Sequence, residues 1–325
     1  MDTTLGIYAL PALVACAGTA CSMRLWRGVV VRLGMVDDPG HRKIHAEPTP
    51  LAGGVAVLTG WLVALGAGVV AVRTFWWDPA TQAALWHGVG RRAGQLAVLV
   101  GGAVAMTILG ALDDRHELRP AAKFVGQWVV ASAVALAGIR ITLFVPDPFF
   151  SYAVTVLWIL TLVNAFNFTD NMNGLCAGLG LIASWYFAMS AARQGQYLVA
   201  ACGFAVCGAL AGFLPWNFPR ARVFLGDSGS HLVGYWVAVL AILPHFYSEV
   251  HPRGYAVLSP LWVVGVPLAD LVQVVIRRWR RGQPFYVGDT QHFSHLLVRC
   301  GLSPVRAVLL LWLVAAATGA VALLW

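Results

Sequence analysis

Charged residues are scarce in this chain of 325 residues. They make up 11% of it, whereas about 25% is usual in soluble globular domains, and only 14 residues are Asp or Glu. The sequence also lacks a linker, a low-complexity segment or a polar stretch long enough to form a soluble domain. These absences exclude an ordinary soluble protein and indicate a chain that lies in a lipid bilayer almost throughout.

Three further absences narrow the choice. The six cysteines have no metal-ligand spacing, and most stand in apolar runs, where a free thiol behaves as a small packing residue. The first residues, Met-Asp-Thr-Thr, provide no basic segment of the kind that opens a secretory signal, so the apolar run behind them is predicted to be a first membrane span. No nucleic-acid-binding motif is present, and the basic residues behind the net charge of +8 flank apolar runs. We therefore expect no nucleic acid partner.

What the sequence does contain is apolar runs of transmembrane length. Hydrophobic residues make up 59% of it, the mean hydropathy is +0.73, and about 20 apolar residues suffice to cross a bilayer. We predict an all-α, polytopic integral membrane protein of about ten transmembrane helices, in which residues 1–325 form one membrane-embedded domain. The predicted spans are 5–23, 52–72, 93–112, 122–139, 151–166, 174–192, 197–214, 230–247, 255–276 and 305–325.

Basic and acidic residues both favour one side of this topology. If the loops alternate between the two sides, one set of loops contains 15 of the 22 Lys and Arg residues and the other set contains six. The positive-inside rule makes the first set cytoplasmic and places both termini on the non-cytoplasmic side. Ten of the 14 acidic residues lie in or beside the same loops. Because carboxylates in hydrocarbon are costly, this crowding predicts a polar site at the cytoplasmic face.

The first motif on that side is Gly110-Ala-Leu-Asp113-Asp114-Arg-His-Glu117, at the end of a predicted span. Two adjacent carboxylates repel each other unless a cation offsets the charge. Mg²⁺ typically takes one or two carboxylates together with substrate phosphates, so Asp114 is a candidate metal ligand and both acids are candidate catalytic residues. The simpler interpretation is a solvated helix end with incidental charges.

The second motif places Asn164, Asn167, Asp170 and Asn171 around the end of the span over residues 151–166. In a helix, the three Asn residues share a face. Amides there are costly in a bilayer unless they meet a polar ligand or each other, so a substrate contact and polar packing between helices both remain open.

The third motif is Phe224-Leu-Gly-Asp227-Ser-Gly-Ser230, which precedes the predicted span over residues 230–247. Its small residues leave backbone N–H groups free, and the N-terminus of the following helix favours an anion. Mg²⁺ on Asp227 could hold a pyrophosphate at this place. The alternative is an ordinary Gly/Ser turn with Asp227 as the helix cap.

Two more cytoplasmic loops carry weaker signals. His292 and His295 lie in a basic loop, which suits a phosphate better than zinc because four ligands cannot be completed. Arginines that meet lipid head groups are the other interpretation of this loop. The first loop contains Lys43, a candidate phosphate contact. Asp270, inside a predicted span, is expected to pair with an Arg or an amide rather than to act in catalysis.

With these motifs in this order, the sequence resembles the polyprenyl-phosphate N-acetylhexosamine-1-phosphate transferases from about Val36 to Ser303. The resemblance implies that Asp113 activates the lipid phosphate and that Lys123 contacts phosphate. It implies that Asp227 binds Mg²⁺ and that Phe224 contacts uracil. The remaining residues that it implies in the nucleotide, pyrophosphate or histidine sites are Asn164, Asn167, Asp170, Asn217, His292 and His295.

Two positions depart from the family pattern. Asn173 stands where the family usually has an Asp, so an anionic role there is in doubt. Ser294 stands where the family loop usually has another His, which favours the branch that transfers N-acetylglucosamine over the branch that transfers phospho-MurNAc-pentapeptide.

The function that the resemblance implies is transfer of a sugar 1-phosphate from a UDP-sugar to undecaprenyl phosphate or another polyprenyl phosphate, with release of UMP. The implied cofactor is Mg²⁺, with Mn²⁺ as a substitute. The implied location is the cytoplasmic (inner) membrane, with the site facing the cytoplasm, and a homodimer is compatible with it. The alternatives are an intramembrane prenyltransferase, which would need a second acidic cluster, and a secondary transporter, which would show repeats and acids near the bilayer midplane.

Overall fold

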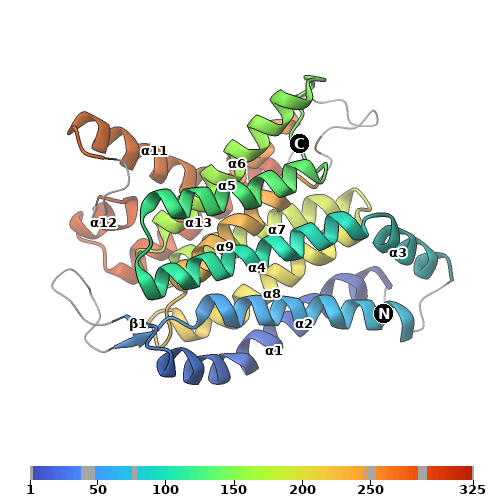
Figure 1. Ribbon diagram of the computed structural model, residues 1–325, viewed down its shortest axis with the longest axis horizontal. Helices are drawn as coiled ribbons and strands as arrows, with labels where there is room; N and C mark the ends of the chain where they lie inside the picture. The colour runs from blue at the N-terminus through green and yellow to red at the C-terminus, as the bar shows by residue number, and fades with distance from the viewer. Residues whose placement is uncertain are drawn as a thin grey trace.

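A computed structural model describes residues 3–37, 48–74, 79–244, 246, 254–284 and 291–323. The long helices run side by side in one bundle, and the short antiparallel strands β1 (Val36–Asp37) and β2 (Thr49–Pro50) lie at one end of it (Figure 1). The helices of the first half are α1 (Thr3–Arg32), α2 (Gly53–Thr74), α3 (Pro79–Arg91), α4 (Ala93–His116), α5 (Pro120–Leu136) and α6 (Pro148–Thr169). Those of the second half are α7 (Leu175–Arg193), α8 (Tyr197–Asn217), α9 (Gly226–Leu240), the 3₁₀ helix η1 (Gly254–Leu258), α10 (Ser259–Val263), α11 (Gly265–Arg280), α12 (Phe293–Arg299) and α13 (Pro304–Ala322).

Local sequence signals explain where several helices begin. Helices α5, α6 and α13 each open with a proline, whose missing N–H is not needed in the first turn. Asp147 caps α6 by accepting a hydrogen bond from the Phe150 N–H at 2.7 Å, and Ser303 caps α13 by accepting from the Arg306 N–H at 3.3 Å. These caps fix the entry of the chain into two of the apolar helices.

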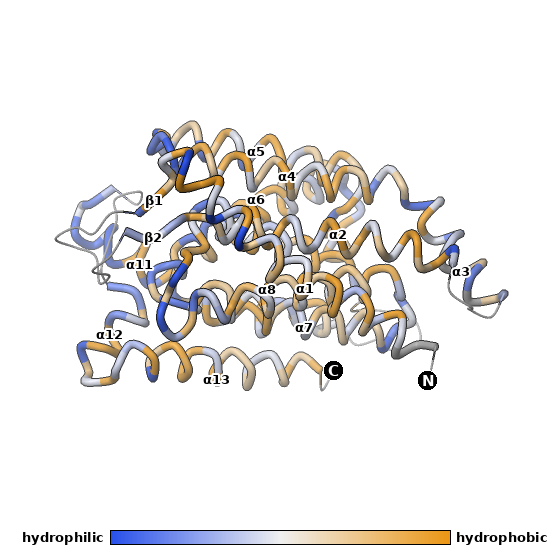
Figure 2. Tube along the Cα trace, turned by 90° about the horizontal axis from the view of Figure 1, so that it is seen from below, coloured by the Kyte–Doolittle hydropathy of each residue, from blue (hydrophilic) through white to orange (hydrophobic). Residues whose placement is uncertain are grey.

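The surface of the bundle is apolar along its length. Large apolar side chains such as Leu13, Leu136, Leu157 and Leu313 are at least 65% exposed. Hydrophilic residues gather at the end that carries β1, β2, α11 and α12, while the middle of the bundle is hydrophobic (Figure 2). An apolar girdle of this kind is suited to lipid, so the chain is a multi-pass α-helical membrane protein.

The number of spans is less certain than the helical architecture. Among the described residues, seven helices have the length and apolar character needed to cross a bilayer, or eight if the pair α10 and α11 counts as one span. That pair bends by 70°, so the segment predicted as a span over residues 255–276 consists of two helices rather than one straight helix. The helices within the predicted spans 122–139 and 230–247 have only 17 and 15 residues. The total of ten spans and the side of each terminus therefore stay predictions.

Helix α9 is the centre of the bundle. Every residue in it except Asp227 is buried, and it packs against α2, α4, α6 and α7. At about 1.5 Å per residue, its 15 residues form a helix about 22 Å long, which is shorter than the roughly 30 Å hydrocarbon core of a bilayer. Because its residues are buried from the first turn to the last, both of its ends lie among other helices. Its N-terminus is therefore held within the polar end of the protein.

Candidate active site

The site forms where the ends of four helices meet at the polar end of the bundle. Asp113 comes from the last turn of α4, Lys123 from the first turns of α5, Asn167 from the end of α6, and Asp227 from the first turn of α9. These positions are up to 114 residues apart in sequence. The structure therefore brings together residues from each of the three strongest sequence motifs.

Lys123 joins two of the carboxylates. Its Nζ forms a close ion pair with Asp113 Oδ2 and lies 3.4 Å from Asp227 Oδ2. The Asp113 side chain is only 2% exposed, whereas those of Lys123 and Asp227 are 30% and 32% exposed. Asp113 Oδ1 also accepts the Leu118 N–H at 2.8 Å, which fixes the turn between α4 and α5. Asp113 is thus an internal anchor, while Lys123 and Asp227 face the open side.

Asn167 orients Asp227 from the other side. Its Nδ2 donates to Asp227 Oδ1 and to Ser230 Oγ, each at 2.9 Å, so both of its N–H groups are used. Asp227 therefore has one oxygen held closely by an amide and the other more loosely by a lysine. The hydrogen bond from Asn167 to Asp227 therefore joins the second and third sequence motifs.

Asp114 caps helix α9 from a neighbouring helix. Its Oδ1 accepts the Asp227 N–H at 2.8 Å, and its Oδ2 accepts the Ser228 N–H at 3.1 Å. An anion at a helix N-terminus is stabilised by the unpaired N–H groups and the helix dipole. Two of the N–H groups that the sequence suggested for a substrate anion are thus occupied by a protein carboxylate.

Two glycines allow this cap to form. A Cβ atom on Gly110 would lie 2.2 Å from the backbone oxygen of Asp227, and one on Gly226 would lie 2.7 Å from Asp114 Oδ2. Gly226 also has φ +72°, in the left-handed region that glycine tolerates best. The close approach of α4 and α9 explains why both motifs contain glycine.

The turn after α6 adds a fourth acid, Asp170, to the region. Burial, and then the charges of Asp227 and Asp114, raise the pKa of the Asp170 carboxyl well above its ordinary value. Among the described residues, no three His, Cys, Asp or Glu side chains form a group that could hold a metal ion together. An ion that takes one carboxylate and relies on substrate phosphates for the rest still fits this set, because Asp227 is accessible and the surrounding charge is negative.

Asn164 lies deeper than the carboxylates. Its Nδ2 donates to Gln127 Oε1 at 2.7 Å, and Gln127 Nε2 lies 3.4 Å from His231 Nε2. Gln127 and His231 are fully buried. Asn164 thus belongs to a polar network that links α5, α6 and α9, as the polar-packing interpretation of the second motif requires, and its substrate contact stays a prediction.

The histidine loop is held by Asp270 on α11. Asp270 Oδ2 lies 2.7 Å from His292 Nδ1, and Asp270 Oδ1 accepts the Phe293 N–H at 2.7 Å. Asp270 was expected to pair with an arginine or an amide, and in the structure its partners are the Phe293 backbone amide and His292. His295 stands beside His292, with ring centroids 6.1 Å apart.

Contacts with the turn after α6 place this loop beside the carboxylate cluster. The His292 ring meets the edge of Phe168, which adjoins Asn167 in sequence, with centroids 5.9 Å apart. Ser294 Oγ donates to Asn171 Oδ1 at 2.6 Å. Ser294, one of the two departures from the family pattern, therefore ties the histidine loop to the second motif.

The remaining predicted site residues are Asn217, Phe224 and Lys43. Asn217 is buried, accepts the Gly174 N–H at 2.5 Å and donates to the Val223 backbone oxygen at 2.9 Å, so it holds two loops together. The backbone of half-buried Phe224 bonds to Pro50 and Gly53, which fastens β2 and the start of α2 to α9. Lys43 lies outside the described residues.

Similarity to known proteins agrees with this arrangement. Residues 96–245, which contain the carboxylate cluster, match the sequence profile of glycosyl transferase family 4. A Mycobacterium tuberculosis protein named decaprenyl-phosphate N-acetylglucosaminephosphotransferase is 35% identical over 313 residues, covering 88% of this chain and 74% of that protein. The chain belongs to glycosyl transferase family 4.

Two more relatives of this family 4 protein carry similar names. A Bacillus subtilis protein, named a probable undecaprenyl-phosphate N-acetylglucosaminyl 1-phosphate transferase, is 32% identical over 295 residues, covering 88% of this chain and 76% of its own length. An Escherichia coli undecaprenyl-phosphate alpha-N-acetylglucosaminyl 1-phosphate transferase is 28% identical over 313 residues, covering 92% and 78%. The predicted family and transferase class are confirmed, and the prenyltransferase and transporter alternatives are excluded.

Sequence reasoning missed two residues of this family 4 site, Gln127 and His231. It did single out Asp270 for a pairing role, but not as the partner that holds His292 in place. Gln127 and His231 were not singled out, because a lone polar residue in an apolar run is usually polar packing. The available signal was spacing, since His231 follows Asp227 by four residues and Gln127 follows Lys123 by four, which places each pair on one helix face.

Proposed function

We propose that this protein transfers an N-acetylhexosamine 1-phosphate, with GlcNAc 1-phosphate as the first choice, from a UDP-sugar to undecaprenyl phosphate or another polyprenyl phosphate. UMP is released, and the product begins a cell-envelope polysaccharide. The observation that carries the proposal is the bridge of Lys123 between Asp113 and Asp227, formed at the polar end of a membrane bundle. The names of the relatives support the lipid acceptor and the sugar.

The reaction is a displacement at phosphorus. An oxygen of the lipid phosphate forms a bond to the β-phosphorus of the UDP-sugar, and the bond from that phosphorus to the bridging oxygen breaks, so UMP leaves with the oxygen and the electron pair. A phosphate monoester has its second pKa at about 6 and is largely dianionic at neutral pH. No strong base is then required, and the protein contributes positioning and charge neutralisation.

The described side chains divide this work. Lys123 contacts a phosphate oxygen, and Asp113, which is nearly inaccessible, acts by holding Lys123 in place rather than by touching the lipid phosphate. Asp227 would hold Mg²⁺, and the ion would supply charge neutralisation at the pyrophosphate. Asn167 fixes the Asp227 carboxylate, and Asp114 fixes the start of α9 that carries it.

The location of the site suits one water-soluble and one bilayer-held substrate. The carboxylates lie where the apolar girdle gives way to hydrophilic residues, so a nucleotide sugar can enter from water while the lipid keeps its tail in the bilayer (Figure 2). The excess of Lys and Arg in the loops at this end favours a cytoplasmic orientation in the inner membrane.

The test is UMP release by the purified chain with undecaprenyl phosphate, Mg²⁺ and a panel of UDP-sugars given one at a time. We expect UMP only when lipid, metal and one N-acetylhexosamine donor are all present. Asp227→Asn should lower kcat by at least about 100-fold, because it removes the accessible anion while keeping an oxygen for Asn167. Asp147→Asn is the matched control, since Asp147 caps α6 away from the site.

Release of UMP without any lipid would contradict the proposed acceptor. Full activity of Asp227→Asn would remove Asp227 from the metal site. A loss of activity in Asp147→Asn equal to that in Asp227→Asn would show that the assay reports folding rather than the site.

A further inference from the structure

A separate hollow lies at the end of the bundle opposite the carboxylate cluster. It has a volume of about 450 Å³ and opens between α2, α4, α8 and α9. Arg92, directly before α4, lines it, whereas Asp113 is near the other end of the same helix. At about 1.5 Å per residue, the two residues are about 30 Å apart along the helix. The proposed transfer site therefore does not include this hollow.

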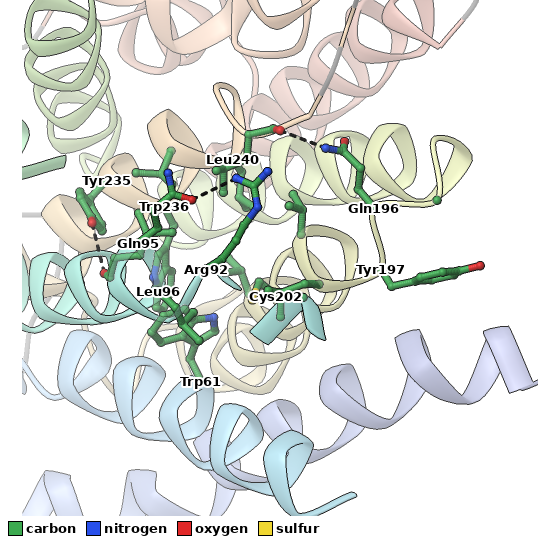
Figure 3. A pocket seen from close by; sticks show the side chains of 18 residues that line it. Trp61, Arg92, Gln95, Leu96, Gln196, Tyr197, Cys202, Tyr235, Trp236 and Leu240 are labelled. Atoms are coloured by element: carbon green, nitrogen blue, oxygen red, sulfur yellow. Dashed lines mark hydrogen bonds between the residues drawn. The ribbon is translucent and has the colours of Figure 1, made fainter. Parts of the chain in front are cut away.

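The inner part of the hollow is apolar. Leu96, Leu99 and Val239 are among its lining residues, and the Trp61 and Trp236 rings pack in a tilted arrangement with centroids 5.1 Å apart. Both indoles are 4% exposed, and neither Nε1 has a hydrogen-bond partner among the described residues. Figure 3 shows both tryptophans among the residues that surround this space. Both N–H groups are thus covered by protein, and the open wall of the hollow is mainly apolar, a lining that suits a hydrocarbon chain.

The rim of the hollow is basic. Arg92 Nη1 donates to Gln95 Oε1 at 3.0 Å, and Gln95 Nε2 donates to the Ala137 backbone oxygen at 3.3 Å. A second, open depression lined by Arg91, Arg92, Gln95 and Ala137 continues outward from the same two side chains. Within the described parts of the chain, no carboxylate forms an ion pair with Arg91 or Arg92. The two hollows together combine an apolar cavity with a basic, acid-free mouth.

We propose that this double hollow binds an anionic phospholipid of the leaflet opposite the catalytic end, with an acyl chain in the apolar cavity and the phosphate at Arg92. The hydrocarbon of a bilayer is about 30 Å thick, so a residue one helix length from the catalytic end reaches the other head-group layer. A guanidinium group binds a phosphate through two parallel hydrogen bonds, and basic pockets between membrane helices suit anionic head groups. The acceptor lipid is a poorer candidate, because its phosphate must reach the opposite end.

The experiment compares lipids of different head group on the purified full chain in a neutral detergent. Phosphatidylglycerol should raise the thermal unfolding midpoint more than phosphatidylcholine does, and glycerol phosphate without chains should have no effect. Arg92→Gln should weaken phosphatidylglycerol binding at least about fivefold, which corresponds to one basic contact with a lipid surface. Arg193→Gln, which removes the same charge from the last turn of α7 without lining the hollow, should bind as the unmodified chain does.

A cavity-filling variant tests the acyl chain. Cys202 lines the apolar part, so Cys202→Phe should reduce the effect of both phospholipids while UMP release stays unchanged. Equal stabilisation by both phospholipids, or phosphatidylglycerol binding that is unaffected by Arg92→Gln, would overturn the proposal. An equal effect of glycerol phosphate would show a free-phosphate site instead. Retained UMP release in Arg92→Gln keeps this test independent of the proposed function.

Discussion

Replacement of Asp114 by Asn distinguishes a residue that positions α9 from a residue that binds metal. In the structure, each Asp114 oxygen accepts one backbone N–H of α9. Asn would keep one neutral acceptor and turn an NH₂ group toward the other N–H. A hydrogen bond to a charged group contributes about 1.5–3 kcal/mol, and an unsatisfied buried donor costs about 1–3 kcal/mol. Asp114→Asn should therefore lower stability by about 2–4 kcal/mol.

The assay is thermal unfolding of the purified protein without substrate or Mg²⁺, followed by UMP release over a range of Mg²⁺ concentrations up to saturation. Asp114→Asn should unfold at a lower temperature and lose turnover, because the Asp227 carboxylate moves with the start of α9. Asp227→Asn is the comparison, since it should lose turnover with little change in unfolding. An Asp114→Asn protein that unfolds like the unmodified chain, and whose turnover returns at high Mg²⁺, would refute the positioning role and restore Asp114 as a metal ligand.

Two more predictions follow from the packing and the charge of the site. Gly110→Ala forces a Cβ atom against the backbone of Asp227, so it should cost about 1–3 kcal/mol and lower turnover, whereas Gly101→Ala on the same helix meets nothing within 4 Å and should be neutral or slightly stabilising. Equal unfolding temperatures for the two variants would contradict the contact. The folded-state pKa of Asp170 is raised, so its ionisation destabilises the protein as the pH rises through that pKa. Asp170→Asn should thus raise the unfolding temperature at pH 8 without Mg²⁺, with the gain vanishing below about pH 4, where the unfolded carboxyl is also protonated.

The helical architecture followed from the sequence because a membrane helix depends on a single local property. Twenty apolar residues must form their hydrogen bonds internally wherever the rest of the chain lies. That rule fails for α9 and for the bent pair α10 and α11, since a helix enclosed by other helices need not match the bilayer. Helices α3 and α12 were not predicted, because neither contains an apolar run of transmembrane length.

The sequence predicts which residues gather at the candidate site, but not what each of them contacts. Alternation of the loops was enough to place the acidic motifs on one side. The different contacts of Asp113 and Asp114 could not be predicted, because their partners, Lys123 and the start of α9, come from other helices. The contacts of Asn217 could not be predicted for the same reason, since its two backbone partners lie in loops that the sequence does not pair.

Helix α9 also holds together the helices that carry the site. Its first turn is capped by Asp114, its Asp227 carboxylate is oriented by Asn167, and its buried His231 meets Gln127. Each of these partners belongs to a different helix, so α4, α5 and α6 are all aligned by reference to α9. For the proposed transfer, a carboxylate that would hold a cation needs this kind of alignment, because small displacements of a reacting group are costly. The short buried helix supplies a rigid support that a lipid-facing helix, free to tilt with the bilayer, would not.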